Sequence, residues 1–193
     1  MPRLAAYEVL KAVRVDGAYA NLVLPAVVRH YQLDARDAAF ATELASGTLR
    51  RRGTYDAIIA SCADRPLRKI EEKVLDALRL GTHQLLSMRV PDHAAISTTV
   101  SLVRAKGSSG AGNFTNAVLR RVSEHDLEEW IELVAPRKSP SRYAEIAFSH
   151  PAWIVDELRK AVGEEELHAV LAADNEPPRV TLVARPGRAS VEE

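Results

Sequence analysis

Apolar residues recur three and four positions apart along most of the first 124 residues, which is the period of a helix with one buried face. Short polar or glycine-containing connections separate the periodic stretches. Because short connections place successive helices side by side, the pattern predicts a compact helical bundle. The stretch with the most regular apolar spacing, residues 67–88, is expected to cross its core. The expected helices span residues 2–15, 20–31, 35–52, 54–62, 67–88, 93–106 and 113–124.

Residues that cap or end helices set the expected boundaries. Asp34 is predicted to be the N-cap of the third helix, and Asp92 the N-cap of the sixth. Gly53 is expected to end the third helix at Arg52, because glycine commonly follows the last helical residue.

The composition of the chain changes after residue 124, where acidic residues are in excess and prolines interrupt the helical pattern. We therefore expect a domain at residues 1–124 and a second, mainly helical segment at residues 125–193. Pro151 is predicted at the first position of a helix that stops near Gly163, where a second helix follows. Residues 180–184 alternate like a strand, and an isolated strand is not stable without partners.

Composition supports an all-α fold. Aromatic residues make up 5% of the chain, while Ala, Leu, Val, Arg and Glu dominate, and these residues favour helices. No run of 18 apolar residues is present and the start lacks a signal peptide pattern, so we expect a cytoplasmic protein without a membrane partner. The six histidines and single cysteine show no metal-ligand spacing, so no metal is expected.

Nothing in the sequence predicts a catalytic residue. Ser46, Ser61 and Cys62 have no recognisable histidine or acidic partner for nucleophilic catalysis. A small buried thiol is the expected state of Cys62. No glycine-rich cofactor motif follows a strand, so no cofactor is expected within this chain.

Charge is divided unevenly, although the formal net charge is zero. Residues 1–123 contain 18 Lys and Arg against 11 Asp and Glu, a net +7, and residues 124–193 contain 8 against 15, a net −7. The first part can therefore attract a polyanion. We expect one basic surface that contacts phosphates, formed by Arg50, Arg51, Arg52, Arg104, Lys106, Arg120 and Arg121. The alternative for the Arg50–Arg52 run is that it only complements a helix C-terminus.

The stretch GAGNFTNAVLRRV, residues 110–122, predicts a largely buried helix with Asn113 as its N-cap. Asn116 and Arg120 fall on its narrow polar face, where they either satisfy each other or share an outside acceptor. Arg121 lies within the apolar arc and would have to extend its charged end to solvent. The preceding glycine turn at residues 110–112 either binds a phosphate through its backbone or is a plain loop.

Three segments carry a resemblance to known proteins: RDAAFATELASGTLRRRGTYDAII, VLDALRLGTHQLLSMRVPDHAAI and FTNAVLRRV. They resemble the transcription antitermination factor NusB and, more closely, the NusB-like N-terminal domain of bacterial 16S ribosomal RNA cytosine-C5 methyltransferases, the Sun, RsmB or Fmu family. The resemblance covers about residues 3–123. Residues 149–187 resemble the segment that leads into the catalytic half of those enzymes.

The resemblance implies an RNA-binding helical domain followed by the start of a subdomain that leads to a methyltransferase domain, which has no counterpart before Glu193. Its implied partners are 16S ribosomal RNA and that domain, with S-adenosylmethionine as cofactor of the latter. The implied RNA-binding residues are the seven cations above together with Asn116. The alternatives are a separate antitermination module and a helical docking or dimerisation domain without RNA contact, and we expect either a monomer or a weak dimer.

Overall fold

The computed structural model describes residues 1–106 and 109–176, and every regular element in that part is helical. The all-α prediction is therefore confirmed. The strand expected at residues 180–184 lies outside the described residues. The elements are α1 (Pro2–Asp16), α2 (Ala20–His30), α3 (Ala35–Arg50), α4 (Arg52–Cys62), the 3-10 turn η1 (Leu67–Lys69), α5 (Glu72–Leu86), α6 (Asp92–Lys106), α7 (Ser109–Val122), α8 (Leu127–Val134), α9 (Pro140–Ala147) and α10 (Ala152–Ala173).

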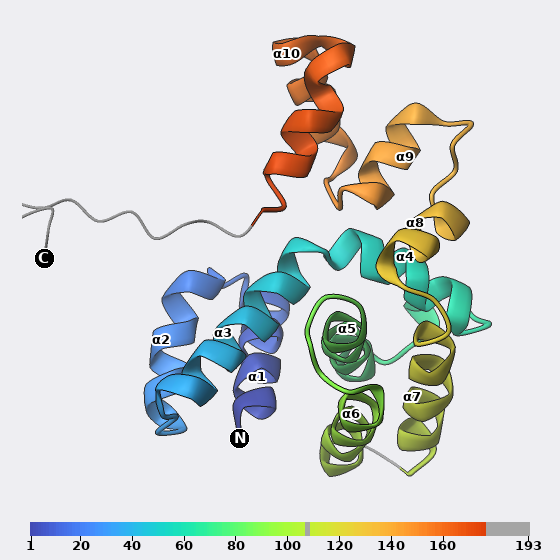
Figure 1. The fold of residues 1–193 in the computed structure, drawn as a ribbon. Helices are drawn as coiled ribbons and strands as arrows, with labels where there is room; N and C mark the ends of the chain where they lie inside the picture. The colour runs from blue at the N-terminus through green and yellow to red at the C-terminus, as the bar shows by residue number, and fades with distance from the viewer. Residues whose placement is uncertain (107–108, 177–193) are drawn as a thin grey trace, which may run out of the picture.

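Helix α5 is the centre of the bundle, as its sequence predicted (Figure 1). Every residue from Val74 to Gln84 is buried, because α1, α3, α4, α6 and α7 all contact this helix. The expected single helix over 67–88 is shorter, since Ile70 and Glu71 are extended and separate η1 from α5. The side chain of Ile70 is buried, so this extended step brings the chain into the core.

A buried network of ion pairs joins three helices. Asp76 of α5 accepts from Arg14 of α1 at 2.7 Å and from Arg79 at 3.1 Å. Arg79 in turn donates two hydrogen bonds to Asp56 of α4, at 2.7 and 2.9 Å. Asp76 is almost completely buried, and the positive charges of Arg14 and Arg79 compensate its negative charge. The network therefore fixes α1 and α4 against the central helix.

Two predicted helix boundaries are wrong, and in both cases tertiary packing overrides local preference. Gly53 does not end α3, which stops at Arg50; it lies inside α4, where its N–H donates to Ser149 Oγ at 2.8 Å. Likewise, α7 begins at Ser109, so Asn113 is inside the helix and residues 110–112 form no separate turn. Gly112 lets α7 approach the side chain of Arg104, which a Cβ would meet at 2.7 Å.

Of the four other predicted caps and breaks, two are present and two are displaced by one residue. Asp34 caps α3 by accepting from the N–H of Asp37 at 2.7 Å, as expected. Asp92 is not an N-cap, because it is already the first residue of α6. Pro151 is the N-cap of α10 and not its first residue. Gly163 breaks α10 with φ 80° and ψ 172°, which confirms the expected division into two helical halves.

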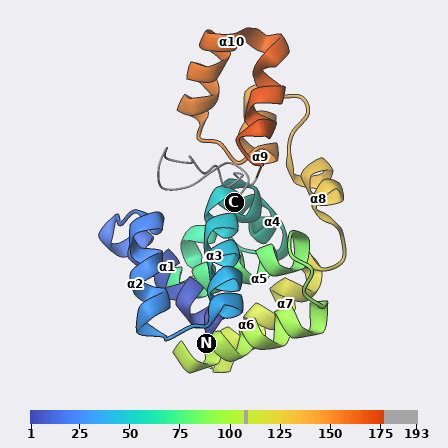
Figure 2. The ribbon, with the colours of Figure 1, turned by 60° about the vertical axis from the view of Figure 1, so that its left-hand side comes forward.

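Helices α9 and α10 lie beyond α4, on the side away from α6 (Figure 2). Their buried apolar residues form a small cluster that is separate from the bundle core: Ala144, Val155, Leu167 and Leu171. Trp130 of α8, by contrast, belongs to the bundle core and donates from Nε1 to the carbonyl oxygen of Val122 at 2.8 Å. The boundary at residue 124 stays a prediction.

Candidate nucleic-acid interface

Three consecutive arginines lie where the chain changes direction between α3 and α4. Arg50 ends α3, Arg52 begins α4, and Arg51 between them has φ −100° and ψ 19°. We call Arg50, Arg51 and Arg52 the arginine elbow. Because the helix axis turns at Arg51, the three side chains are not all in the last turn of one helix. A favourable interaction with the negative end of a helix dipole therefore explains Arg50 but not Arg51 or Arg52.

Positive charge at the elbow is not neutralised within the described part of the chain, where none of the three arginines forms an ion pair. The N-terminus of α4 adds the positive end of a helix dipole. Arg52 also lines an open hollow of about 390 Å³ between α4 and α9, together with Arg142 and Glu145. The elbow therefore offers cations, a helix N-terminus and an accessible recess in one place.

A buried polar network lies beneath the elbow. The Tyr55 hydroxyl is hydrogen bonded to His83 Nδ1 and to Ser87 Oγ, each at 2.8 Å. His83 Nε2 faces Glu43 Oε1 at 3.7 Å. Burial, together with the nearby charges of Arg51 and Arg50, lowers the pKa of His83 to about 4, so the imidazole is neutral at pH 7. His83 thus fills space beneath the elbow without adding positive charge.

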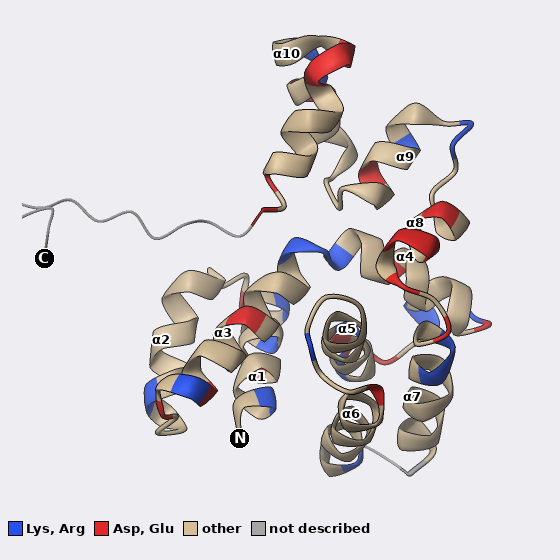
Figure 3. Ribbon diagram, in the orientation of Figure 1, with Lys and Arg blue, Asp and Glu red and all other residues tan. Residues whose placement is uncertain are grey.

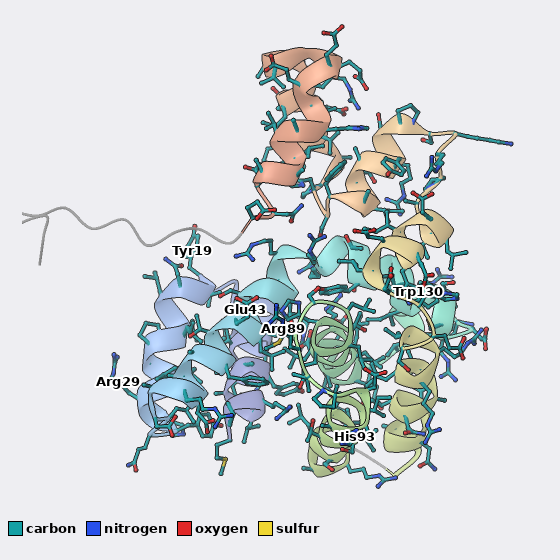
Figure 4. The ribbon with its side chains drawn as sticks, in the orientation of Figure 1. Tyr19, Arg29, Glu43, Arg89, His93 and Trp130 are labelled. Atoms are coloured by element: carbon teal, nitrogen blue, oxygen red, sulfur yellow. The ribbon has the colours of Figure 1, made fainter. Side chains whose placement is uncertain are left out.

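Arg89 follows this network in the turn after α5. Its side chain is exposed and forms no ion pair with any other described residue. Ser87, two residues before Arg89, is hydrogen bonded to the Tyr55 hydroxyl, and Figure 4 shows Arg89 and Glu43 close together in projection. Arg89 therefore adds a further cation on the α5 side of the elbow, which the sequence analysis did not single out.

The two arginines of α7 differ in their surroundings. Arg121 donates to the carbonyl oxygen of Cys62 at 2.9 Å and to Asp64 Oδ2 at 2.6 Å, both at the end of α4. Its charged end therefore extends away from α7 to the end of α4, where it meets a backbone carbonyl and an exposed carboxylate. Arg120 is exposed, and no hydrogen bond joins it to the half-buried Asn116 in the described chain. Mutual satisfaction of Asn116 and Arg120 is thus not what the structure shows.

The predicted cations do not form one continuous surface (Figure 3). Arg121 contacts the opposite end of α4 from Arg52, about 15 Å away at 1.5 Å per residue. Arg104 lies in the last turn of α6, where Nη2 donates to Asn113 Oδ1 at 3.4 Å. The side chain of Lys106 lies outside the described residues. RNA contact by each of these residues stays a prediction.

A second group of cations lies between α4 and α5, and the sequence analysis did not propose it. Arg65, Arg68 and Lys69, here called the basic corner, are exposed and form no ion pair among the described residues. The guanidinium of Arg65 stacks over the ring of Phe114 at 4.4 Å. Arg65, Lys69 and Phe114 line an open hollow of about 280 Å³. The signal in the sequence was the run ADRPLRK, but only the fold brings it against α7.

The cysteine is unsuited to nucleophilic chemistry. Burial raises the pKa of the Cys62 thiol to about 11, so the reactive thiolate is scarce at neutral pH. Among the described residues, no three His, Cys, Asp or Glu side chains are placed to hold a metal ion. The same residues include no helix with the length and apolar character needed to cross a membrane.

Comparison with known proteins places this arrangement in context. The sequence model of the NusB family matches residues 1–124. The chain is 47% identical over 189 residues to "Putative methyltransferase Rv1407" of Mycobacterium tuberculosis, covering 96% of this chain and 41% of that protein. It is 35% identical over 185 residues to "Ribosomal RNA small subunit methyltransferase B" of Pseudomonas putida, covering 95% of this chain and 40% of that protein.

Structural comparison gives the same fold. A chain in the structure described as "Crystal Structure of a Plectonemic RNA Supercoil" superposes with a TM-score of 0.59 at 22% sequence identity, covering 63% of this chain and 90% of that one. The chain spans about two fifths of the length of the curated relatives that it matches. Those relatives therefore contain more than half of their residues outside the region compared.

Proposed function

Because the chain belongs to the NusB family and matches part of longer ribosomal RNA methyltransferases, we propose that it is the RNA-binding N-terminal region of a 16S ribosomal RNA cytosine-C5 methyltransferase. Its role is to hold ribosomal RNA while a further domain transfers the methyl group from S-adenosylmethionine. Every regular element of the described residues is helical, and none is a strand followed by a glycine-rich turn, so these residues do not fit that cofactor. We assign it to the part of the protein outside these residues.

The observation that carries the proposal is the arginine elbow. The three arginines form no ion pair in the described chain, so they contribute little to the stability of the fold through charge. Each guanidinium can, however, replace a counterion along an RNA backbone. The elbow lies at the positive end of α4, which favours phosphate further. Contacts of this kind position RNA without reading its sequence.

The basic corner forms a second group of cations at the other end of α4, directly after that helix ends. A strand that contacts both groups would run roughly parallel to α4, over about 15 Å. The partly covered ring of Phe114 lies within reach of a base at that end.

The test is fluorescence anisotropy of a labelled 16S ribosomal RNA hairpin over a salt series. The elbow variant carries Arg50→Gln, Arg51→Gln and Arg52→Gln. Its control carries the same loss of charge at Arg137, Arg159 and Lys160, which lie in the acidic part of the chain and each pair with a neighbouring carboxylate. Circular dichroism of both variants reports whether the helices remain folded.

The wild-type slope of log K against log salt is expected to be about −0.7 for each phosphate contact, and the elbow variant should be flatter by about one to two contacts. The control should leave the slope unchanged. Equal slopes for the elbow variant and wild type would refute the elbow as an RNA surface. Absence of binding at low salt would instead favour a docking domain without RNA contact.

A further inference from the structure

Helix α2 lies at the outer edge of the bundle, where it packs against α1 and α3 (Figure 1). None of its 11 residues is buried. Its inner side contacts the bundle core through four partly buried residues: Ala20, Val23, Leu24 and Val27. Residues 17–28 include no charged side chain. The outward side of α2 is therefore mostly apolar, whereas the outward side of a surface helix is usually charged or polar.

This outward side carries a stripe of four exposed residues: Leu22, Pro25, Ala26 and Arg29. At 100° per residue, the four fall within about 100° of the helix circumference. Val15 and the N-cap residue Tyr19 add apolar surface next to the start of the stripe. Val15, Tyr19 and Leu22 are 59%, 75% and 70% exposed, and they are three of the six exposed large apolar side chains in the described chain. A concentration of this kind indicates an interaction surface.

The two ends of the stripe differ in chemistry. Arg29 lies at the C-terminal end, and its exposed guanidinium forms no ion pair with another described residue. The other end carries the Tyr19 ring, with the exposed carboxylate of Asp16 three residues earlier. Figure 4 shows Tyr19 and Arg29 at opposite ends of α2, which are about 15 Å apart at 1.5 Å per residue. A cation at one end therefore matches an aromatic ring and a carboxylate at the other.

We propose that this stripe is a dimer interface, in which α2 packs antiparallel against α2 of a second copy of the chain. A twofold axis level with residue 24 places Tyr19 of one copy opposite Arg29 of the other, and Leu22 opposite Ala26. The large leucine side chain then meets a small alanine, which lets the two helices approach closely. The guanidinium meets the tyrosine ring, a favourable cation–π pair. The stripe is thus complementary to itself, as a twofold interface requires.

The size of the stripe predicts a weak, reversible dimer. With 11 residues α2 is about 16 Å long, so one pair of such helices buries less than the roughly 1,200 Å² of a stable specific interface. The antiparallel arrangement also brings the positive end of each helix dipole beside the negative end of the other. This inference does not depend on RNA binding.

The experiment is sedimentation velocity of the full 193-residue chain from about 10 μM to about 1 mM. The test variants are Leu22→Asp, which puts a carboxylate into the stripe, and Ala26→Leu, which fills the space that Leu22 of the second copy needs. The matched control is Leu133→Asp, which replaces another exposed leucine, in α8. Circular dichroism of each variant reports whether the helices remain folded.

The sedimentation coefficient of the wild type should rise with concentration. Leu22→Asp and Ala26→Leu should each raise the dimer dissociation constant at least about tenfold, while Leu133→Asp should leave it unchanged. Ala26→Leu is the sharper test, because added apolar area would strengthen non-specific adhesion but obstructs the antiparallel pair. A wild type that stays monomeric at every concentration would overturn the proposal. A dimer that persists in both test variants, or that Ala26→Leu strengthens, would overturn it as well.

Discussion

Replacing Gly47 by alanine should destabilise the bundle, although alanine is the better helix former. Gly47 lies in α3 against the His83 ring, and an added Cβ would come 2.3 Å from Nε2 and 2.4 Å from Cε1. Ordinary contact begins near 3.4 Å, so the ring would have to move by about 1 Å. The ring cannot move freely, because it is buried and bonded to the Tyr55 hydroxyl at 2.8 Å.

The magnitude follows from three contributions. Overpacking costs about 1 to 3 kcal/mol, and weakening the Tyr55–His83 hydrogen bond costs about 1 kcal/mol more. The gain in helix propensity offsets up to about 1 kcal/mol. We therefore expect Gly47→Ala to lower the free energy of unfolding by about 1 to 3 kcal/mol, measured by urea denaturation followed by circular dichroism.

Gly112→Ala is the matched control. Its Cβ would also meet a neighbour at 2.7 Å, but the neighbour is the exposed, flexible side chain of Arg104. Arg104 can change its rotamer because it is exposed, so Gly112→Ala should cost less than Gly47→Ala, and the gain in helix propensity offsets up to about 1 kcal/mol of that cost. A Gly47→Ala protein as stable as wild type, or equal losses in both variants, would show that contact with the histidine ring does not govern the position.

Three further changes have expected outcomes. Because the pKa of His83 is about 4 in the folded chain against about 6.5 when unfolded, only the unfolded state takes up its proton between these values. Stability should fall by about 3 kcal/mol as pH drops from 6.5 to 4, and the urea midpoints of His83→Gln should depend less on pH there. Asp76→Ala removes the carboxylate shared by Arg14 and Arg79, but Arg79 keeps Asp56, so thermal denaturation should show a loss of about 1 to 3 kcal/mol. Gly163→Ala forces alanine to φ 80°, at about 1 to 3 kcal/mol, and should speed amide exchange in residues 164–173 but not in α5.

The helices were predictable from sequence where burial and local chemistry agree. The apolar spacing of α5 identified the central helix, and Asp34 and Gly163 marked a start and a break correctly. In these places the residue that favours a boundary meets no competing contact. The α3–α4 junction differs, because Gly53 is used for a contact with Ser149, 96 positions away. No local pattern contains that information.

The candidate site was predictable in residue type but not in arrangement. The run Arg50–Arg52 is evident as a cluster of charge, yet its position across two helices depends on where α3 ends. Arg121 is a residue type that often contacts phosphate, but its guanidinium already pairs with the carboxylate of Asp64. The basic corner was missed because its relation to Phe114 arises only when α7 packs beside η1.

The ion pair between Arg14 and Asp76 also constrains how the chain folds while it is being made. The two residues are 62 positions apart, so α1 leaves the ribosome well before its partner helix exists. At about 5 to 20 residues per second, this interval lasts roughly 3 to 12 s. During that time the apolar face of α1, including Val9 and Leu10, has no α5 to cover it. Until α5 emerges, α1 can pack only against α2 and α3, which also contact it in the folded bundle.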